Sequence, residues 1–583
     1  MSSYLNELCR FYGRMTSDPA SGMPPEGMTA EFISFALVLS EDGELVRVED
    51  LRDSRGKPIR QFVPAAVKRS VNIAANFLWD NTGYVLGVDD KGKQERSKQT
   101  AESFRHLHRN MLAGCENPHA QALLTFLDKW KPEMFAGLEL RESMLNSNLA
   151  FKPDGQDCFL HEIPELKARW LDALHSAGNA TEKGICLVSG RQGGIALTHP
   201  SIKGVIGAQS SGAALVSFNC PSFTSYGKEQ NANAPVSENA ARAYTSALNY
   251  LLQREHRQMV RIGDTCMVFW ADKASPAEIL FGDFFDPAPP AESEQDREQI
   301  ERLKGILQAL RKGLPLNEAD RELDTGARFY VLGLAPNAAR LSVRFWLTNT
   351  LEVLLRNISR WYADLNIERQ FPDSEPEFPA LWLLLVRTVA AQGKSENIPP
   401  GLGGQMAHAM LSGSHLPENV FTAALQRIHA DKQVGYYRAA LIKAYLRRNQ
   451  EEEKDMTTLN TEGQSNGYRL GRLFALLEKT QKDALGTVNA PLRERYIGAA
   501  SATPRLVFPM LLRLCQHHVT KAAKNDFAGY ETVFNKRMAE ILGDMADFPA
   551  VLPLHEQGRF MLGYYHQTNA LYQKKTNSAE AGE

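Results

Sequence analysis

The pattern of hydrophobic residues changes near residue 348, and this change restricts the folds open to the chain. Before it, short β-type runs alternate with stretches of helical spacing. After it, apolar residues recur three and four positions apart, which is typical of amphipathic helices. The sequence therefore predicts an α+β N-terminal part, with a mixed sheet and helices, followed by an all-α helical bundle. Because 583 residues exceed one hydrophobic core, we expect separate domains over 1–347 and 348–583.

The first 150 residues predict a strand pair and two helices. Residues 30–39 and 45–48 are β-type runs on either side of Glu41-Asp42-Gly43, which is a turn sequence. Residues 67–79 and 97–113 have helical spacing and carry several basic side chains.

Further strands are predicted at 185–189, 214–218 and 265–270. Ser237 is the expected N-cap of a helix that extends to about Gln253, because Pro235 lies just upstream. Such alternation of strands and helices supports the α+β assignment.

Residues 286–325 are rich in proline and charge and predict a surface insertion. Two apolar runs, 329–334 and 341–346, then predict a hairpin around Pro336-Asn337. The clearest helical face of the C-terminal part consists of Leu470, Leu473, Phe474 and Leu477.

Charge and cysteine content limit the function classes. The formal net charge is −2, so nucleic-acid binding would need local basic patches or partner subunits. None of the 7 cysteines has CxxC spacing, which argues against a disulfide framework or a zinc site and favours a reducing cytoplasm. We expect no signal peptide, because the N-terminus lacks a basic region followed by an apolar run, and no membrane helix, because no apolar run approaches roughly 20 residues. We also expect no cofactor.

The sequence contains no recognisable catalytic motif. The glycine-rich stretch 190–194 lacks the lysine of a nucleotide-binding loop, so it predicts either a tight turn or a phosphate-cradling loop. Asp373, Glu375 and Glu377 alternate with prolines and predict a solvated loop rather than a nuclease centre. We therefore expect a protein that is not an enzyme, although catalytic residues can converge from distant positions. An unrecognised nuclease remains an alternative.

The stretch 217–235 is dense in hydrogen-bonding side chains and poor in catalytic acids and bases. Asn and Gln can read base edges, tyrosine can stack, and serine and lysine can hold phosphates. A turn whose polar groups satisfy one another is an equal alternative for 217–226.

Separated blocks of the sequence resemble one known family. The blocks are Arg69 through Asn81 with Tyr84 to Gly87, Gly194 through Pro235, Tyr330 through Trp346, and Leu470 through Gln567. They keep their order over roughly 500 residues. The chain thus resembles the large subunit of the type I-C CRISPR surveillance complex (Cascade), the Csd family.

This resemblance implies a role in antiviral defence within an RNA-guided complex. The family recognises the protospacer-adjacent motif (PAM) in double-stranded DNA, promotes strand opening and R-loop formation, and stabilises the displaced strand. It also helps recruit a helicase-nuclease, which does the cutting. The implied partners are target DNA, the guide RNA complex, and the backbone, handle-binding and small subunits of Cascade. A non-catalytic scaffold that holds guide RNA and partner subunits without reading bases is the alternative.

Because base pairing to the guide reads the target, the protein needs to read only a few PAM base pairs. The first candidates for this contact are Asn219, Ser225, Tyr226, Lys228, Gln230 and Asn231. A second set, Lys68, Arg69 and Asn72, lies on the helix expected at 67–79, where a solvated face is the alternative.

An internal translation start is also predicted. Glu451-Glu452-Glu453-Lys454 is encoded only by purine codons and lies one codon before Met456, as a ribosome-binding site would. A product of 583 − 456 + 1 = 128 residues would hold 15 Lys and Arg against 12 Asp and Glu, a net +3. In the resembled family such a small subunit lines the displaced strand; a solvated charge run is the alternative. The expected strand-backbone contacts are Arg469, Arg472, Lys479, Lys482, Arg493 and Arg505.

Overall fold

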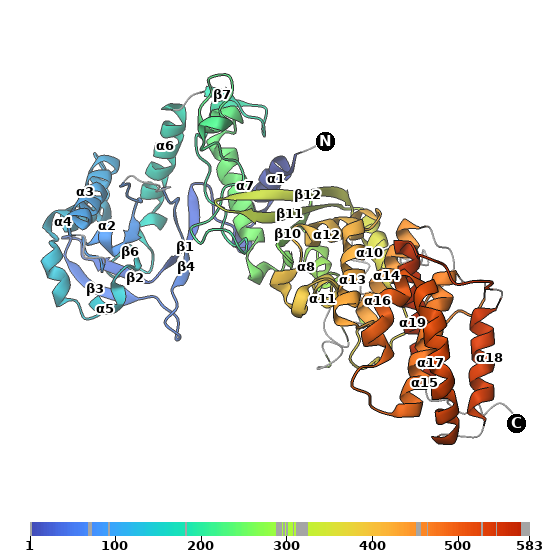
Figure 1. Cartoon of the computed structure of the whole chain (residues 1–583). Helices are drawn as coiled ribbons and strands as arrows, with labels where there is room; N and C mark the ends of the chain where they lie inside the picture. The colour runs from blue at the N-terminus through green and yellow to red at the C-terminus, as the bar shows by residue number, and fades with distance from the viewer. Residues whose placement is uncertain are drawn as a thin grey trace, which may run out of the picture. The chain divides into compact units, whose positions relative to one another are not determined.

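The chain folds into two compact units, which are described separately (Figure 1). Unit 1 comprises Met1–Gly204, Ala208–Tyr250 and Ala338–Leu341, and unit 2 comprises Val205–Gly207, Leu251–Asn337 and Ser342–Glu583. The computed structural model describes residues 3–67, 73–90, 94–180, 183–286, 324–450, 456–462, 465–525, 529–543, 545–572 and scattered positions between 294 and 309.

The central sheet of unit 1 is mixed, as the sequence predicts. Its strand order is β3-β2-β6-β5. The inner strand β2 (Phe35–Leu39) pairs antiparallel with β3 (Leu45–Asp50) and parallel with β6 (Asn148–Pro153). The edge strand β5 (Trp79–Asn81) is antiparallel to β6. The predicted β2–β3 turn is confirmed, and Gly43 adopts the positive φ of +73° that the turn requires.

Unit 1 also contains helices and two short strand pairs. The helices are α1 (Tyr4–Thr16), α2 (Thr82–Val85), α3 (Gln94–Met111), α4 (Pro118–Lys129), α5 (Arg141–Met144), α6 (Pro164–Ala180) and α7 (Glu238–Leu251). The antiparallel pairs are β1 (Met28–Ile33) with β4 (Ile59–Pro64), and β7 (Lys183–Ile185) with β8 (Gln192–Gly194). The predicted helices at 97–113 and 237–253 are confirmed as α3 and α7, and Gly190–Gly194 lies in the β7–β8 turn and β8.

Three predictions for unit 1 are wrong. The expected strand at 185–189 shares only Ile185 with β7, and residues 187–189 form a turn. The described part of the expected helix at 67–79 is not helical and ends in β5. There the Asn76 side chain accepts from the Val67 N–H at 2.9 Å, and Asp80 accepts from the Asn76 N–H at 2.9 Å. The Asp80 bond satisfies the Asn76 N–H, which a helix would have bonded to the carbonyl four residues earlier. The expected strand at 214–218 is reduced to one isolated bridge between Ala214 and Arg340.

A buried histidine joins α3 to the chain before β5. The two ring nitrogens of His108 lie 2.7 Å from the Phe104 carbonyl oxygen and 2.9 Å from the Leu78 amide nitrogen. Burial lowers the pKa of His108 to about 4, although the Phe104 contact opposes this shift. The neutral ring therefore donates through Nδ1 and accepts through Nε2.

Unit 2 contains an antiparallel sheet with the order β12-β11-β10-β9. Its strands are β9 (Met259–Ile262), β10 (Thr265–Ala271), β11 (Arg328–Asn337) and β12 (Arg340–Thr350). The predicted strand at 265–270 and hairpin at 329–346 are confirmed. Much of the predicted insertion at 286–325 lies outside the described residues.

All longer elements after residue 350 are helical. They are α10 (Leu351–Leu365), α11 (Leu381–Thr388), α12 (Leu402–Ser412), α13 (Glu418–Asp431), α14 (Tyr436–Asn449), α15 (Asn466–Leu485), α16 (Leu492–Ala502), α17 (Pro504–Asn525), α18 (Tyr530–Leu542) and α19 (Leu554–Tyr572). Helix α8 (Ala277–Asp283) precedes them. The predicted helical part is thus confirmed, with Leu470, Leu473, Phe474 and Leu477 fully buried on α15.

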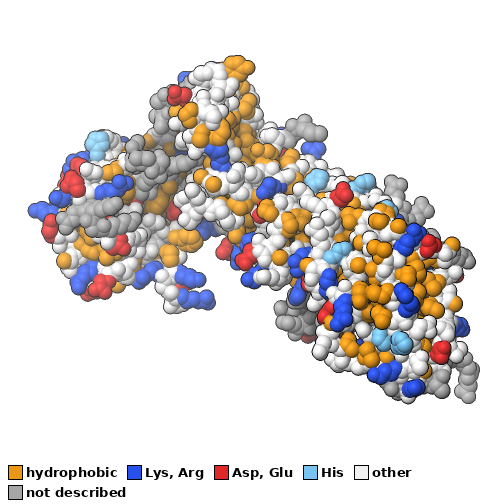
Figure 2. Space-filling model, viewed as in Figure 1, with side chains coloured by type: hydrophobic (Ala, Val, Ile, Leu, Met, Phe, Trp, Pro, Cys, Tyr) orange, Lys and Arg blue, Asp and Glu red, His pale blue; other side chains and the backbone are white. Residues whose placement is uncertain are grey.

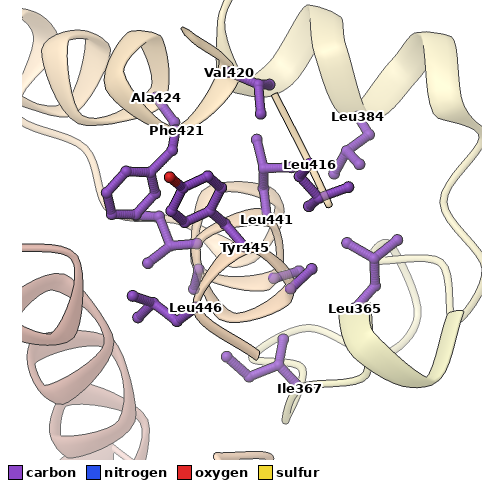
Figure 3. Close-up of a cluster of buried hydrophobic side chains, with 14 of the residues drawn as sticks. Leu365, Ile367, Leu384, Leu416, Val420, Phe421, Ala424, Leu441, Tyr445 and Leu446 are labelled. Atoms are coloured by element: carbon purple, nitrogen blue, oxygen red, sulfur yellow. The ribbon is translucent and has the colours of Figure 1, made fainter. Parts of the chain in front are cut away.

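One hydrophobic core connects the sheet of unit 2 to its helices. Phe269 and Val331 of the sheet belong to the same core as Leu354 and Leu384 of the helices. Figure 3 shows part of this core, where Phe421 lies against Tyr445 with ring centroids 4.1 Å apart. This shared core is consistent with β9, β10, β11 and most of β12 lying in one unit with the helices.

Helices α15 and α19 approach each other closely. A Cβ atom on Gly471 would lie 1.9 Å from the Phe560 carbonyl oxygen, and one on Gly563 would lie 2.1 Å from the Tyr468 carbonyl oxygen. Only glycine permits these backbones to approach so closely, because any side chain would displace a main-chain atom.

Candidate nucleic-acid interface

Residues 217–233 of unit 1 form a surface loop, drawn in green in Figure 1. Every residue from Asn219 to Gln230 is exposed. The loop contains two short 3-10 turns, η4 (Pro221–Phe223) and η5 (Gln230–Asn233). Five of the six first candidates, Asn219, Ser225, Tyr226, Lys228 and Gln230, therefore lie on one exposed surface.

The tip of the loop is a two-residue turn between Ser225 and Lys228. The Lys228 N–H donates to the Ser225 carbonyl at 3.0 Å, and Tyr226 and Gly227 have φ angles of +52° and +70°. Positive φ at both central residues is the signature of a type I′ hairpin turn. The left-handed conformation costs a tyrosine about 1–2 kcal/mol. In return, the turn leaves the Tyr226 side chain 98% exposed at its tip.

Asn233 holds this turn in place. Its Oδ1 accepts from the Ser225 N–H at 3.0 Å, and its Nδ2 donates to the carbonyls of Lys228 and Gln230, each at 2.9 Å. One half-buried side chain thus satisfies three backbone groups of the loop. Asn233 was not among the predicted residues, although asparagine's ability to bond nearby backbone is a signal for such a role.

Arg340 supports the other side of the loop. This residue belongs to unit 1, and its guanidinium donates to Asn219 Oδ1 and lies 4.4 Å from the centroid of the Phe223 ring. The Leu341 N–H donates to the Ala214 carbonyl at 2.9 Å, which fixes the backbone beside it. Sequence reasoning missed Arg340 as a site residue because its partners lie more than a hundred residues away.

The prediction for Asn231 is wrong as far as direct contact is concerned. Asn231 is only 2% exposed, and its N–H donates to the Leu197 carbonyl at 3.4 Å. The chain turns towards the interior of unit 1 at this residue, so the Asn231 side chain is buried beneath the exposed loop. The second candidates, Lys68, Arg69 and Asn72, lie outside the described residues.

The chain on either side of that second set borders an open groove of about 740 Å³ in unit 1. Val67 and Ile73 line it together with one polar face of α3. The α3 residues in the lining are Gln99, Glu102, Ser103, His106, Leu107 and Asn110. The groove therefore combines apolar and hydrogen-bonding groups.

The predicted strand-backbone residues of unit 2 mostly bond within the protein. The prediction for Arg472 is wrong, because this residue is 2% exposed and its guanidinium donates to Gln567 at 2.9 Å and Glu540 at 2.6 Å. Arg505 pairs with Asp547 at 2.7 Å, and Arg469 donates to the Leu542 carbonyl at 3.4 Å.

The other three predicted cations differ in their partners. Lys479 pairs with Asp483, and Arg493 lies 3.8 Å from Glu478. Lys482 is exposed, has no ion pair with another described residue, and lies 4.9 Å from the Tyr572 ring centroid. On the face shown in Figure 2, Lys and Arg side chains are scattered among hydrophobic ones over the C-terminal helices. These six residues therefore do not form one unpaired basic stripe.

Met456 lies in the core of unit 2. It is 5% exposed, and the neighbouring Thr457 carbonyl accepts from the Glu368 N–H at 2.8 Å. The purine-coded run 451–455 lies outside the described residues.

The described residues contain neither a grouped set of metal ligands nor a membrane-spanning helix. Within this part of the chain, no three His, Cys, Asp or Glu side chains are grouped so that they could hold a metal ion. No helix of the described chain has the length and apolar character needed to cross a membrane.

Comparison with known proteins identifies the class. The chain is a CRISPR-associated protein of the Cascade type, because a family model described as CRISPR-associated protein Csd1 matches residues 8–572. It belongs to the Csd1 family, that of the type I-C Cascade large subunit. None of the curated proteins compared with the chain matches it.

Proposed function

We propose that this Cascade subunit recognises the PAM in double-stranded DNA through loop 217–233. In this proposal it also promotes strand opening and R-loop formation, and helps recruit the helicase-nuclease. The observation that carries the proposal is the exposed Tyr226 at the tip of a tight turn, with the side chains of Asn219 and Gln230 exposed on the same loop. A surface of this kind has amides to read bases and a ring to stack on them.

The chemistry of the loop suits the minor groove. That groove is about 6 Å wide and presents mainly acceptors, with one guanine donor. The Asn219 carbonyl is already engaged by Arg340, so its amide N–H groups remain to donate to base acceptors. Lys228 would hold a phosphate, and Tyr226 would stack on a base exposed by strand opening.

An electrophoretic mobility shift of the reconstituted guide complex tests this proposal. Duplex targets with a randomised flanking motif are compared with and without the chain at fixed salt, because phosphate contacts are salt-dependent. We expect binding to become motif-dependent only when the chain is present. The same motif preference without the chain would contradict the proposal.

A scaffold role is the second candidate, and one observation favours it for unit 2. Most of the predicted strand contacts in this unit bond to the protein itself, as Arg472 does. The helices would then hold the displaced strand only through residues such as Lys482. A complex that keeps its motif preference after Asn219→Ala and Gln230→Ala would favour a scaffold for the whole chain.

We propose further that the chain itself does not cleave DNA, since cutting belongs to the recruited helicase-nuclease. Incubation of the isolated chain with labelled DNA and Mg²⁺ or Mn²⁺ tests this. We expect no cleavage products. Metal-dependent cleavage that co-purifies with the chain would contradict it.

We also propose that translation from Met456 yields a separate small subunit. The purine-coded run before Met456 supports this start. In the full chain, α19 packs against preceding helices, and a Cβ on Gly558 would lie 2.6 Å from the Phe421 ring. The short product would therefore expose apolar surface that a partner must cover.

A western blot against the C-terminus tests the internal start. We expect two bands from the parent gene and only the full-length band after Met456→Leu, a substitution of similar volume. A single full-length band from the parent gene would contradict the proposal.

A further inference from the structure

A second exposed surface in unit 1 combines cations with an aromatic ring. It consists of Phe32 on β1, Arg60 on β4, and Arg55 and Lys57 in the loop before β4, and is called the β1–β4 surface below. Strands β1 and β4 lie side by side in Figure 1. None of these four residues belongs to loop 217–233.

Phe32 and Arg60 are cross-strand neighbours. They are paired directly in the antiparallel register of β1 and β4, so their side chains lie on the same face of the pair. Phe32 is 60% exposed, and Arg60 is exposed as well. A large aromatic side chain left in water beside a cation is available to stack on a flat ligand.

The loop 53–57 before β4 carries two cations, Arg55 and Lys57, and one acid, Asp53. The Asp53 N–H donates to the Lys57 carbonyl at 2.8 Å, which closes the loop. The Asp53 carboxylate accepts from the backbone N–H groups of Arg55 and Lys57, each at 2.9 Å. The only acid of the loop is thus used by the backbone, and neither Arg55 nor Lys57 forms an ion pair with another described residue.

The arginines just before this loop differ from Arg55 and Lys57, because each of them is paired with an acid. Arg47 pairs with Asp154 at 2.6 Å and with Glu49 at 2.8 Å. Arg52 donates two bonds to Asp50, at 2.8 and 2.6 Å. Arg47 and Arg52, which precede loop 53–57, are thus paired with acids, whereas Arg55 and Lys57 have no acidic partner among the described residues.

We propose that the β1–β4 surface binds single-stranded nucleic acid, with Phe32 stacked on an unpaired base and Arg55, Lys57 and Arg60 on phosphates. Single strands expose base faces that a duplex hides, and proteins that bind them combine stacking aromatic rings with cations along the backbone. A duplex would offer the cations phosphates but would offer Phe32 no base. The shared chemistry of unpaired DNA and RNA is what this surface fits.

Fluorescence anisotropy of the full chain with labelled oligonucleotides tests the inference. The probes are dT20, rU20 and a 20-base-pair duplex, titrated at about 50 to 200 mM salt. Phe32→Ala should weaken binding of a single strand by about 5- to 100-fold, whereas Phe32→Trp should retain it. The same Phe32→Ala variant should bind the duplex as the parent does.

The double variant Arg55→Ala with Lys57→Ala tests the phosphate contacts. It should lower the slope of log affinity against log salt by about 1.4 on a single strand, since each contact contributes about 0.7. Arg47→Ala is the matched control and should leave the slope unchanged, because Arg47 is already paired. Thermal melts of each variant verify that the chain is folded.

If Phe32→Ala loses more affinity for dT20 than for rU20, the surface prefers DNA, and the reverse result means that it prefers RNA. Equal losses of affinity mean that it binds both. Three results would overturn the inference: no measurable binding of a single strand by the parent chain at 50 mM salt, Phe32→Ala binding as tightly as the parent, or Arg47→Ala reducing the slope as much as the double variant. These readouts do not depend on motif selection by the guide complex, so the inference and the proposed PAM role can fail separately.

Discussion

Units 1 and 2 differ in how they use polar side chains. In unit 2 several charged side chains are buried: Arg448 and Asp364, 3% and 2% exposed, pair at 2.7 Å, and Lys443 donates to the Asp364 carbonyl at 3.0 Å. In unit 1, loop 217–233 turns its side chains outward, while Asn233 satisfies its backbone. A charge that stabilises a helical core is unavailable to a ligand, whereas an exposed loop with a satisfied backbone can bind one.

This difference shows why residue type alone does not identify a contact. Arg472 and Lys482 lie on the same helix and were predicted to share one role. Arg472 is buried between Glu540 and Gln567, whereas Lys482 is exposed. The position of each residue on the helix decides between a structural and a binding role.

The largest expected effect is on the buried pair of unit 2. Arg448→Ala should lower the free energy of unfolding by about 3–5 kcal/mol, because it leaves the buried Asp364 carboxylate with only Arg447 as an ion-pair partner among the described residues, at 3.3 Å. Arg356→Ala is the control, since its exposed pair with Glu352 contributes only about 0.3–0.5 kcal/mol. Denaturant unfolding of both variants makes the measurement. Equal losses would mean that the buried charges of unit 2 do not stabilise it as described.

A substitution at the contact of α15 with α19 should lower the free energy of unfolding almost as much. Gly471→Val should cost about 3 kcal/mol, because its side chain would displace the Phe560 backbone. Gly498→Ala on α16 is the control, since nothing lies within 4 Å of its Cβ position, and alanine should stabilise that helix by about 0.5–1 kcal/mol. Thermal unfolding measures the loss of stability, and limited proteolysis shows whether α15 and α19 are the helices that become accessible. Normal stability of Gly471→Val would contradict the close approach.

Acid should destabilise unit 1 through its buried neutral histidine. The pKa of His108 is about 4 in the folded protein, below the value of about 6.5 in an unfolded chain, so protonation favours unfolding. The associated stability is complete above pH 6.5 and is lost as pH falls towards 4, by about 3 kcal/mol. Hydrogen exchange of α3 amides against pH measures it. His108→Gln should remove the part of this dependence that is due to His108 and leave the part due to His161, whose pKa burial also lowers to about 4. An unchanged profile would contradict the assignment.

Tyr226→Ala should weaken binding of a matched duplex by the guide complex by about 1–3 kcal/mol if the ring stacks on an opened base. Tyr226→Phe should bind like the parent, because the ring face is kept. A mobility shift at fixed salt compares the two. Since the side chain is 98% exposed, neither variant should change stability by more than about 0.5 kcal/mol. Equal binding by Tyr226→Ala and Tyr226→Phe would remove the stacking role.

The smallest effect is expected from the residue that holds the turn. Asn233→Ala removes three hydrogen bonds to backbone, yet the freed groups lie near water, so the cost should be about 1 kcal/mol in DNA binding. Asn233→Asp keeps an acceptor for Ser225 and should lose less. Hydrogen exchange at Lys228 should rise in both variants. Unchanged exchange would mean that Asn233 does not order the loop.

Local patterns predicted most of the fold. The Asp-Gly turn before β3, the Ser237 cap of α7 and the spacing of Leu470 with Leu473 are short-range signals, and each was confirmed. The helix expected at 67–79 failed because Asn76 and Asp80 bond the backbone, which helical spacing does not reveal. The grouping of β10 and β11 with the helices depends on long-range contacts, which local patterns do not reveal.

The site was predicted less completely than the fold. The exposure of Tyr226 could not be deduced from composition, because it depends on positive φ at two successive residues. Arg340 and Asn219 meet across more than a hundred residues, so no local pattern connects them. The burial of Asn231 and Arg472 arises from packing, and equivalent residue types nearby remain exposed.

The most direct test of the account compares motif preference in guide complexes that carry variants in one unit at a time. The first complex contains Asn219→Ala with Gln230→Ala, and the second contains Lys482→Ala with Arg505→Ala. We predict that the first loses its preference on a randomised flanking motif, whereas the second keeps it and binds all sequences slightly more weakly. Unchanged preference in the first complex, or lost preference in the second, would contradict the assignment of recognition to the exposed loop of unit 1.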